Sequence, residues 1–437
     1  MKQPAWTLSF ASNWSVLMAR LETMTGGRSA TTGVIRGRYA LSVGNPGIKP
    51  PIGFSWVRLT DLARLESGHT PSRRIADYWG GDIPWIGIRD ATANHGKIIF
   101  STNQHITESG LANSSARLLP ESTVCLSRTA SVGYVVTMGV PMATSQDFIN
   151  WVCEPGLSSK YLHYIFMCEQ ESVRQFAHGT THQTVYYPEA KAFHVCIPSK
   201  AEQDRVVQTL SALDDKISTN ERIVAICDEL RRVSLEDEML RSAPIKVPLS
   251  SIARFVNGRA FTKGATGTGR MVVRIAELNS GPSASTIWNE LNVDDVHLAQ
   301  AGDVLFAWSG SLTVARWFRP EAIINQHIFK VIPNSNLPTW LIYELVNQKL
   351  DVFRGIAADK ATTMGHIQRR HLDELISAPD FSTIGNLDRK LGPLWQRALA
   401  AETENLTLAE MRDALLPRLL SGELRVTDAE RLVEDAV

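Results

Sequence analysis

Hydrophobic residues recur at helical spacing through the middle of the chain, in a stretch with no glycine or proline between Leu210 and Arg232. Intervals of three and four residues are typical of a helix with one apolar face. The pattern predicts a long helix over residues 201–243, with a stripe that drifts around it. The stripe consists of Val206, Leu210, Leu213, Ile217 and Val224, continued by Ile223, Ile226, Leu230 and Val233.

A second helical pattern, over residues 383–424, repeats every seven residues, which is typical of a coiled coil. Asn405 and Arg412 interrupt it with polar side chains. Its apolar positions are Leu387, Leu394, Ala401, Leu408 and Leu415, accompanied by Leu391, Ala398 and Leu419.

A helix of some 40 residues measures about 60 Å, which is longer than a domain of 150 residues is wide. Each long helix therefore needs a partner along its length, and the other long helix is the only equal one. We expect an antiparallel pair that places two equivalent domains at opposite ends, related by a pseudo-twofold axis. The alternative is a surface helix on each domain.

Short apolar runs bounded by Gly, Pro and Asn predict strands in the rest of the chain. The first set of strands is expected over residues 83–90, 123–128, 135–143 and 193–198, with a helix over 159–178. The second set is expected over residues 270–278, 303–310 and 322–332, with a helix over 337–357.

The two sets repeat each other. Residues 57–68 align with 247–258, and residues 124–133, 145–149 and 161–166 align in the same order with 304–313, 325–329 and 340–345. Gln146 falls on Gln326. Four matches at a nearly constant offset indicate a tandem duplication of about 180 residues. The fold class is therefore α+β, with two tandem pseudo-repeated domains and two long antiparallel coiled-coil helices.

This plan divides the chain into six parts. Residues 1–53 are rich in turn formers and are expected to be a flexible leader or the product of a start assigned too far upstream. The other parts are a first domain (54–200), a central helix (201–243), a second domain (244–382), a distal helix (383–424) and a tail (425–437).

Composition narrows the function classes. The 437 residues include 45 basic and 45 acidic side chains, so no global field favours nucleic acid, a membrane or an acidic partner. The five cysteines form no CxxC pair and fit buried thiols in a reducing cytoplasm. No run of 18 apolar residues exists, which excludes a membrane-spanning segment.

Motifs for catalysis are missing. The sequence has no GxxxxGK[ST] phosphate loop, no [ND]PP[YFW] methyltransferase motif and no paired-carboxylate nuclease motif. The glycine-rich residues 264–270 precede a predicted strand and are expected to form a hairpin loop. His178 and His182 flank Gly179 and make a poor metal site. We expect no catalytic residue and no metal site in this chain.

Four segments resemble the specificity subunit of type I restriction-modification systems. They are WVRLTDLARLESGHTPSR (56–73), SKAEQDRVV (199–207), ALDDKISTNERI (212–223) and MRDALLPRLLSGELRV (411–426). The resemblance spans about residues 54–426. It implies two target-recognition domains, each of which reads one half of a split site on double-stranded DNA, and two helices that set the spacing.

The same resemblance implies partners. Two copies of a modification subunit that methylates adenine would dock on the helices, and motor-nuclease restriction subunits can join them. S-adenosylmethionine, ATP and Mg would belong to these partners, and this chain would hold no cofactor. The docking positions expected on the helices are Asp214, Asp215, Lys216, Asn220, Arg222, Leu415, Leu416, Arg418 and Leu419.

Residues that contact DNA should lie on loops with forked donors, cations or small hydroxyls. In the first domain we expect Arg128, Thr129, Ser131, Thr180, Thr181, His182 and Gln183, with Arg73, Arg74, Arg89 and Lys97 in support. In the second domain we expect Trp308, Ser309, Ser311, Lys360, Thr362, Thr363 and His366, with Lys263, Arg270 and Arg274 in support.

Each of these residues has a plain structural alternative, a solvated side chain or a local salt bridge, and for Trp308 the alternative is burial. Gln146 and Gln326 could bind adenine, but they lie inside strand patterns, where a structural hydrogen bond is at least as consistent.

Charge and the missing motifs leave two functions open. Residues 51–200 hold 12 basic and 12 acidic side chains, and residues 244–382 hold 14 and 12, so the isolated chain should bind DNA weakly. The preferred function is DNA recognition within a methylation and restriction complex. The alternative is a non-enzymatic coiled-coil scaffold with two protein-binding domains.

Overall fold

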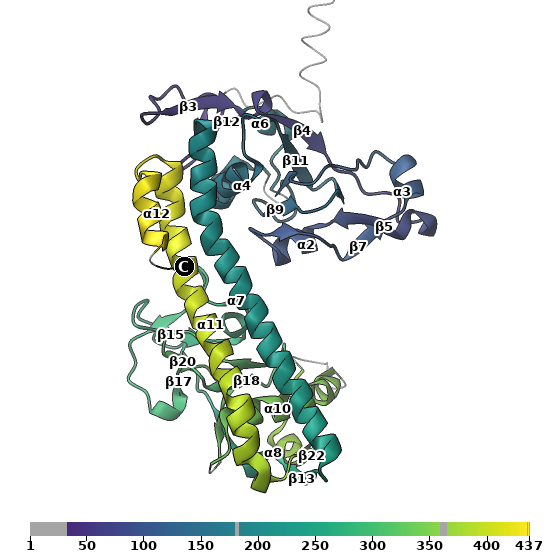
Figure 1. Ribbon diagram of the computed structural model, residues 1–437, viewed down its shortest axis with the longest axis vertical. Helices are drawn as coiled ribbons and strands as arrows, with labels where there is room; N and C mark the ends of the chain where they lie inside the picture. The colour runs from purple at the N-terminus through teal and green to yellow at the C-terminus, as the bar shows by residue number, and fades with distance from the viewer. Residues whose placement is uncertain (1–32, 180–182, 335, 359–364, 435, 437) are drawn as a thin grey trace, which may run out of the picture. The chain divides into compact units, whose positions relative to one another are not determined.

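The computed structural model describes residues 33–434 and 436, apart from 180–182, 335 and 359–364 (Figure 1). The chain forms two compact units. Unit 1 runs to Leu213 and resumes at Met411, and unit 2 comprises Asp214–Glu410. Each unit thus contains one globular domain and part of both long helices. No helix among the described residues is long and apolar enough to cross a membrane.

The first sheet of unit 1 includes residues that the sequence assigns to a leader. Its strand order is β1-β2-β12-β3, with antiparallel pairs throughout. The strands are β1 (Ile35–Arg36), β2 (Leu41–Val43), β12 (Phe193–Pro198) and β3 (Phe54–Arg58). Because β2 is buried between β1 and β12, the predicted leader boundary at residue 53 is wrong, and the domain already includes residues 35–53.

A buried carboxylate holds this segment in place. Glu169 lies between two helices, is fully buried, and accepts hydrogen bonds from the backbone amides of Arg38, Tyr39, Ala40 and Leu41 at 2.6–3.1 Å. A carboxylate that accepts several amide hydrogen bonds is well satisfied inside a protein. The fold of residues 38–43 therefore depends on one acidic side chain some 130 residues away.

Two further sheets complete the first domain, in the orders β4-β11-β8-β9-β6 and β10-β5-β7. Their strands are β4 (Ala63–Ser67), β5 (Trp79–Ile86), β6 (Ile98–Ile99), β7 (Gln104–Ile106), β8 (Val124–Ser127), β9 (Val135–Met138), β10 (Ala143–Thr144) and β11 (Phe148–Cys153). The helices are α2 (Ile88–Ala93), α3 (Glu108–Ala112), α4 (Ser159–Cys168), α5 (Gln170–Phe176) and α6 (Tyr187–Lys191), with 3-10 helices η1 (Leu59–Asp61) and η2 (Ala76–Tyr78).

Three elements of the first domain differ from the predicted strands and helix. The strand expected over 83–90 ends at Ile86, because Asp90 accepts a hydrogen bond from the Gly87 amide at 2.8 Å and helix α2 begins. The strand expected over 135–143 divides into β9 and β10. The helix expected over 159–178 divides into α4 and α5 at Glu169.

Unit 2 contains the second domain, with sheets β14-β21-β18-β19 and β16-β15-β20-β17 and the pair β13-β22. Its strands are β13 (Ile245–Pro248), β14 (Ala253–Asn257), β15 (Arg270–Val273), β16 (Trp288–Asn289), β17 (Leu298–Ala299), β18 (Val304–Ala307), β19 (Thr313–Arg316), β20 (Ala322–Ile324), β21 (Ile328–Pro333) and β22 (Leu375–Ala378). The helices are α8 (Leu249–Ile252), α9 (Ile275–Ser280) and α10 (Thr339–Ala358), with 3-10 helices η3 (Asp295–His297), η4 (Arg369–Asp373) and η5 (Phe381–Thr383).

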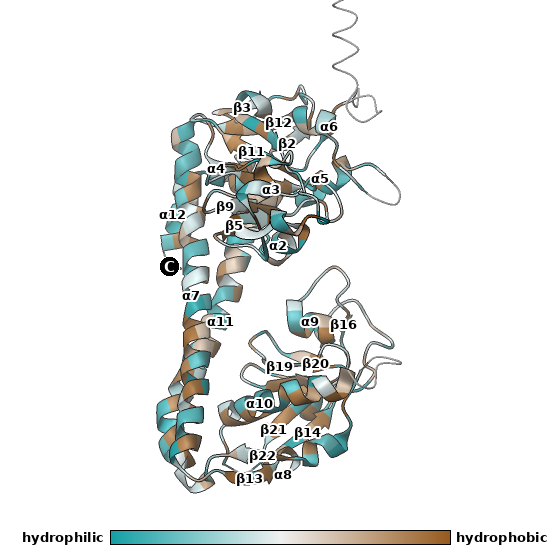
Figure 2. Ribbon diagram, turned by 90° about the vertical axis from the view of Figure 1, so that its right-hand side faces the viewer, coloured by the Kyte–Doolittle hydropathy of each residue, from teal (hydrophilic) through white to brown (hydrophobic). Residues whose placement is uncertain are grey.

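The second domain departs from prediction in the same way as the first. The strand expected over 270–278 ends at Val273 and α9 follows, with Glu277 capping the helix as Asp90 does in α2. The strand expected over 322–332 is two strands, β20 and β21, joined by a turn at residues 325–327. Strand β21 carries mainly hydrophobic residues (Figure 2).

Equivalent strands pair identically in the two domains, which confirms the duplication. β11 is antiparallel to β4 and β8, as β21 is to β14 and β18. β10 is parallel to β5, as β20 is to β15. The predicted α+β class with two tandem pseudo-repeats is therefore confirmed.

The long helices are α7 (Lys200–Arg241) and α11 (Ile384–Leu420), close to the predicted bounds of 201–243 and 383–424. In unit 2 they pack in antiparallel orientation. The Asn220 side chain donates to Asn405 at 3.0 Å, whereas farther along α7 the Arg231 guanidinium lies 5.0 Å from the Trp395 ring. The buried seam of α11 includes Leu387, Leu391, Ala398, Ala401, Leu408 and Leu415.

The apolar stripe predicted for α7 is correct only in its first half. Val206, Leu210 and Leu213 are buried, but farther along the buried positions are Asn220, Cys227, Arg231 and Leu235. The predicted continuation, Ile226, Leu230 and Val233, is 54%, 50% and 46% exposed. The stripe predicted for the second half of α7 is therefore wrong.

A buried ionic network explains the change of face. Arg231 is fully buried and forms ion pairs with Glu344 of α10 and Asp228, both at 2.8 Å. Arg316 of β19 pairs with Glu402 of α11 at 2.6 Å and with Asp228 at 3.1 Å. Charged side chains are buried only with such partners. The network fixes both helices to the second domain within unit 2.

The predicted tail forms helix α12 (Val426–Glu434) in unit 1. Val426, Ala429 and Val433 are buried at intervals of three and four residues, which is the spacing of a packed helix face. Arg205 of α7 forms an ion pair with Glu430 at 2.9 Å. The tail thus packs on the first turns of α7.

Candidate nucleic-acid interface

Three loops of the first domain converge at the ends of its strands. They are the β8–β9 loop (128–134), the β10–β11 turn (145–147) and the described residues 178–179 and 183–185, which follow α5. The Arg128 amide donates to the Asp147 carbonyl at 2.8 Å, and the Val185 amide donates to the Arg128 carbonyl at 2.8 Å. A backbone hydrogen bond therefore holds the predicted DNA-contacting segment 127–131 beside Val185, which follows the second predicted segment.

The second domain repeats this arrangement bond for bond. The Trp308 amide donates to the His327 carbonyl at 3.2 Å, and the Ile367 amide donates to the Trp308 carbonyl at 3.1 Å. The β18–β19 loop therefore contacts the β20–β21 turn and the described residues 365–367, which follow α10. We call each set of loops a three-loop frame.

The first frame includes three of the predicted side chains. Arg128 donates from Nε to the Gln146 carbonyl at 3.0 Å and lies 5.0 Å from the Tyr187 ring, which leaves its guanidinium half-buried at the surface of the frame. The Thr129 and Thr184 hydroxyls are 2.9 Å apart. The Ser131 amide donates to the Thr129 carbonyl at 2.7 Å. These contacts hold the β8–β9 loop in a tight turn.

A backbone feature accompanies this turn. Ala130 has a positive φ of 62°, and its equivalent in the second domain is Gly310, with φ of 64°. A positive φ is uncommon for a residue with a Cβ and costs conformational energy. The residue at the tip of the loop thus has the same left-handed backbone conformation in both frames.

Some of the predicted side chains cannot be placed. Gln183 is exposed in the described part of its loop. Thr180, Thr181, His182, Lys360, Thr362 and Thr363 lie outside the described residues.

The supporting residues of the first domain are spread over other elements. Arg73 lies 4.4 Å from the Trp79 ring and donates to Gln104 at 3.0 Å, and Arg74 next to it is exposed. Arg89 is exposed on α2, and Lys97 is exposed before β6. Arg73 and Arg74 follow Thr70, which contacts the first frame, so they stay candidates for phosphate contacts.

Trp308 of the second domain packs against its neighbours. Its indole Nε1 donates to Asn257 at 2.8 Å, and its ring lies 5.7 Å from those of His327 and Phe329. Ser309 is buried and lies 3.0 Å from His327 Nδ1. The structure therefore favours a structural role for the partly buried Trp308 and the buried Ser309, and direct DNA contact by these two side chains stays a prediction. Ser311 stays exposed, and His366 lies 6.3 Å from the Trp308 ring.

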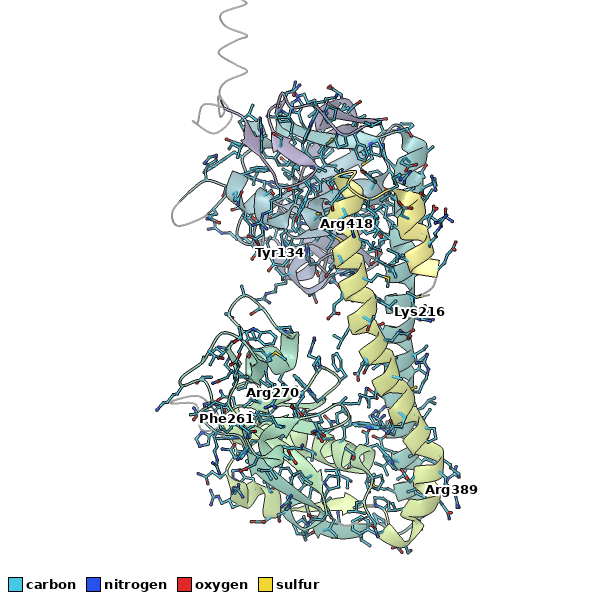
Figure 3. All side chains as sticks on the ribbon, turned by 90° about the vertical axis from the view of Figure 1, so that its left-hand side faces the viewer. Tyr134, Lys216, Phe261, Arg270, Arg389 and Arg418 are labelled. Atoms are coloured by element: carbon cyan, nitrogen blue, oxygen red, sulfur yellow. The ribbon has the colours of Figure 1, made fainter. Side chains whose placement is uncertain are left out.

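The cations expected to support the second frame are mostly paired. Arg270 forms an ion pair with Glu321 at 2.9 Å, and Arg274 donates from Nε to Glu277 at 2.9 Å. Such pairs reduce the charge available to phosphate. Lys263 is exposed (Figure 3 shows the neighbouring Phe261 and Arg270). The local salt bridge is thus the better interpretation for Arg270 and Arg274.

Two residues excluded from the predicted site lie in the frames. Gln146 and Gln326 occupy the middle of the turns 145–147 and 325–327, and both are exposed. The second turn is hidden in the sequence because the apolar residues on both sides of it predict one strand over 322–332. The duplication was the signal that could have found them, since one glutamine aligns with the other.

The predicted docking residues divide by exposure. Four of them are buried within the chain, which contradicts their assignment to a docking surface: Asn220, Leu415, Leu416 and Leu419. Asn220 donates to Asn405 of α11 instead. Asp214 is half-buried, and Asp215, Arg222 and Arg418 are exposed. Lys216, labelled on α7 in Figure 3, forms an ion pair with Glu404 of α11 at 3.4 Å.

Among the described residues, no group of His, Cys, Asp and Glu side chains has the geometry to hold a metal ion. The five cysteines are free thiols, and burial raises the pKa of Cys153 and of Cys168 to about 12. At neutral pH these two thiols are protonated and unreactive.

Comparison with known proteins shows which proteins this chain is similar to. The sequence model of the type I restriction modification DNA specificity domain matches residues 51–226. The chain is 27% identical over 415 residues to the specificity subunit of the type I restriction enzyme MjaIX from Methanocaldococcus jannaschii, which covers 87% of this chain and 95% of that protein. Over most of its length the chain is therefore similar to type I restriction-modification specificity subunits.

Two more proteins are similar to this chain. The EcoprrI specificity subunit of Escherichia coli is 34% identical over 98 residues, which is 22% of this chain and 24% of that protein. The fold is similar to the crystal structure of the type I restriction-modification S subunit from M. genitalium, with a TM-score of 0.53 and 16% identity over 86% of this chain and 97% of that one.

Proposed function

We propose that this chain is the DNA-recognition subunit of a type I restriction-modification complex. Each domain reads one half of a bipartite site with its three-loop frame, and α7 and α11 set the distance between the two halves. The observation that carries the proposal is the frame itself, which recurs in both domains with equivalent backbone hydrogen bonds. Two equivalent reading elements on one chain fit a target that is split into two parts.

The chain supplies specificity and its partners supply chemistry. In this proposal two copies of a modification subunit methylate adenine, and restriction subunits join them to cleave DNA in the cytoplasm. S-adenosylmethionine, ATP and Mg bind to those subunits. The near balance of charge in both domains supports this division, because phosphate affinity must then come largely from the partners.

The exposed side chains of α7 suggest where a partner docks. Ile226, Leu230 and Val233 are about half exposed and follow at intervals of four and three residues on one face of the helix. An apolar stripe of this spacing is typical of a surface that receives another helix. The face lies next to the buried positions Cys227 and Arg231, so it is presented from a helix that the second domain holds in place.

We expect Ile226→Asp combined with Leu230→Asp to abolish copurification of the modification subunit, because two charges would be buried in an apolar contact. Size-exclusion chromatography of the coexpressed subunits measures this. The control is Val352→Asp, which changes a 49% exposed apolar residue on α10. Retention of the modification subunit by the α7 variant would show that docking uses another surface.

The function is tested by sequencing methylated adenines in the host genome with and without the gene. A split motif that loses its methylation with the gene is the expected result, and an unchanged pattern would contradict the proposal. The alternative of a coiled-coil scaffold is not favoured, because the similarity to a specificity subunit covers 87% of the chain.

A further inference from the structure

The β10–β11 and β20–β21 turns have the same plan around a single exposed side chain. Ser145 and Asn325 are 1% and 7% exposed, and the residues after the turns, Phe148 and Ile328, are fully buried. The glutamine in each turn is exposed. One polar side chain therefore projects from a backbone that is buried on both sides of it.

A glycine fixes each turn from the neighbouring strand. A Cβ at Gly68 would lie 2.0 Å from the Ser145 carbonyl oxygen, and a Cβ at Gly258 would lie 2.3 Å from that of Asn325. These distances are shorter than any side chain allows, so only glycine permits the approach. The frame hydrogen bonds to the carbonyls of Asp147 and His327 hold the turns from the other side.

A neighbour orients each glutamine amide. The Thr70 hydroxyl donates to Gln146 Oε1. Gln326 Nε2 lies 3.2 Å from His327 Nε2, and His327 Nδ1 lies 3.0 Å from the Ser309 hydroxyl. In each case the amide still has a free lone pair on its oxygen and an N–H to donate. A carboxamide that presents a donor beside an acceptor matches the N7 and N6 edge of adenine.

We propose that Gln146 and Gln326 are specificity-determining residues, one for each half-site, and that each binds the major-groove edge of an adenine. The inference rests on the proposed DNA-recognition function and adds the base and the side chain that contacts it. A rigid turn suits this task, because a bidentate contact requires both amide atoms to be placed together.

The surroundings of the two glutamines differ. In the first domain the Ser145 hydroxyl donates to the Asp147 carboxylate at 3.0 Å, so the polar side chains of the turn bond to each other. In the second domain Asn325 Oδ1 is buried and has no hydrogen-bond partner among the described residues. It lines a cavity of about 290 Å³ with Arg274 and His327. The same glutamine thus stands in two different settings, which fits two half-sites of different sequence.

The test uses the complex of the full-length chain with its modification subunits. Methylation rates are measured on duplexes in which each base pair of both half-sites is replaced in turn. Gln146→Ala and Gln326→Ala should each slow methylation of the original site roughly 5- to 150-fold, as expected for loss of one bidentate contact. Each variant should lose discrimination at one A·T pair, and the two pairs should lie in different half-sites.

A substitution that changes preference separates recognition from folding. Gln326→Glu should shift the preferred base at its position from adenine to cytosine, because a carboxylate accepts from the cytosine N4 amino group. The matched control is Gln300→Ala, an exposed glutamine that donates to Glu321 at 3.3 Å beside the opposite end of β20. It should leave the base profile unchanged.

Two outcomes would overturn the inference. One is a wild-type base profile in both alanine variants, and the other is an equal loss of rate on every sequence, which indicates damage to the turn. Neither outcome contradicts the proposed function of DNA recognition. That function fails separately if the wild-type complex methylates no split motif that depends on this chain.

Discussion

Single buried polar residues determine the position of backbone segments that the hydrophobic pattern does not predict. Glu169 is the clearest case, because its carboxylate satisfies four consecutive backbone amides of residues 38–41 and so places β2 in the first sheet. The sequence cannot reveal this, since a glutamate within a helical pattern predicts a solvated face. Without this contact, the turn formers in residues 1–53 predict a flexible leader.

We expect Glu169→Gln to lower the local free energy of unfolding around β2 by about 2–3 kcal/mol, because charged hydrogen bonds are lost and one acceptor becomes a donor. Hydrogen exchange at the amides of residues 38–43 measures the change. Glu171→Gln, which alters a 52% exposed partner of Arg174, should change exchange by less than about 1 kcal/mol. Equal effects of the two substitutions would contradict the role of Glu169.

A buried histidine gives the first domain a pH dependence. Burial lowers the pKa of His163 to about 4 from its ordinary 6.5, and the ring bonds the Thr137 hydroxyl at 2.8 Å. The folded state therefore favours neutral histidine. Its contribution to stability is complete above pH 6.5 and is lost as the pH falls toward 4.

Between pH 7 and pH 5 this loss should amount to about 2 kcal/mol, measured by hydrogen exchange of strand β9 in the full-length chain. His163→Asn preserves a polar atom near Nδ1 and should reduce the loss. Part of it should remain, because burial and Arg174 also lower the pKa of His95. A pH dependence that stays the same in the variant would assign the effect to other groups.

At the scale of elements, hydrophobic periodicity predicts the bounds and the buried face of a helix where apolar side chains alone select that face. The heptads of α11 place its bounds and seam correctly, since the hydrophobic effect alone selects that face. Ionic contacts override the pattern in α7, where Arg231 takes a buried position and leaves Ile226 exposed. The turn at 325–327 is hidden because the strands on both sides of it are buried and are predicted as one strand.

A polar layer sets the register of the helix pair. Asn220 is fully buried and donates to Glu404 at 2.7 Å and to Asn405 at 3.0 Å, while Asn405 donates to the Ile217 carbonyl at 3.2 Å. Buried amides of this kind specify alignment in coiled coils at some cost in stability.

We expect Asn220→Leu to destabilise the pair by about 1–3 kcal/mol, because Asn405 and Glu404 lose their partner. Adding Asn405→Leu should restore much of that loss. Urea unfolding of both single variants and the double variant measures the coupling. Additive effects in the double variant would show that the two asparagines act independently.

At the scale of the whole molecule, the duplication is the most informative feature of the sequence. It predicts the tandem domains and equivalent loops, and it pairs Gln146 with Gln326 before any coordinates are known. What it cannot predict is which loop side chains remain available. Four side chains that the sequence predicts to contact DNA form hydrogen bonds or ion pairs within their own domain instead: Trp308, Ser309, Arg270 and Arg274.

In the proposed function, the helix pair of α7 and α11 sets the distance between the two half-sites on DNA. Inserting one heptad into each helix beside the Asn220–Asn405 layer lengthens the pair by about 10 Å while preserving the seam. Sequencing methylated adenines in cells that carry this variant should show both half-sites unchanged and the spacer between them longer by up to about three base pairs. An unchanged spacer in an active variant would contradict the claim.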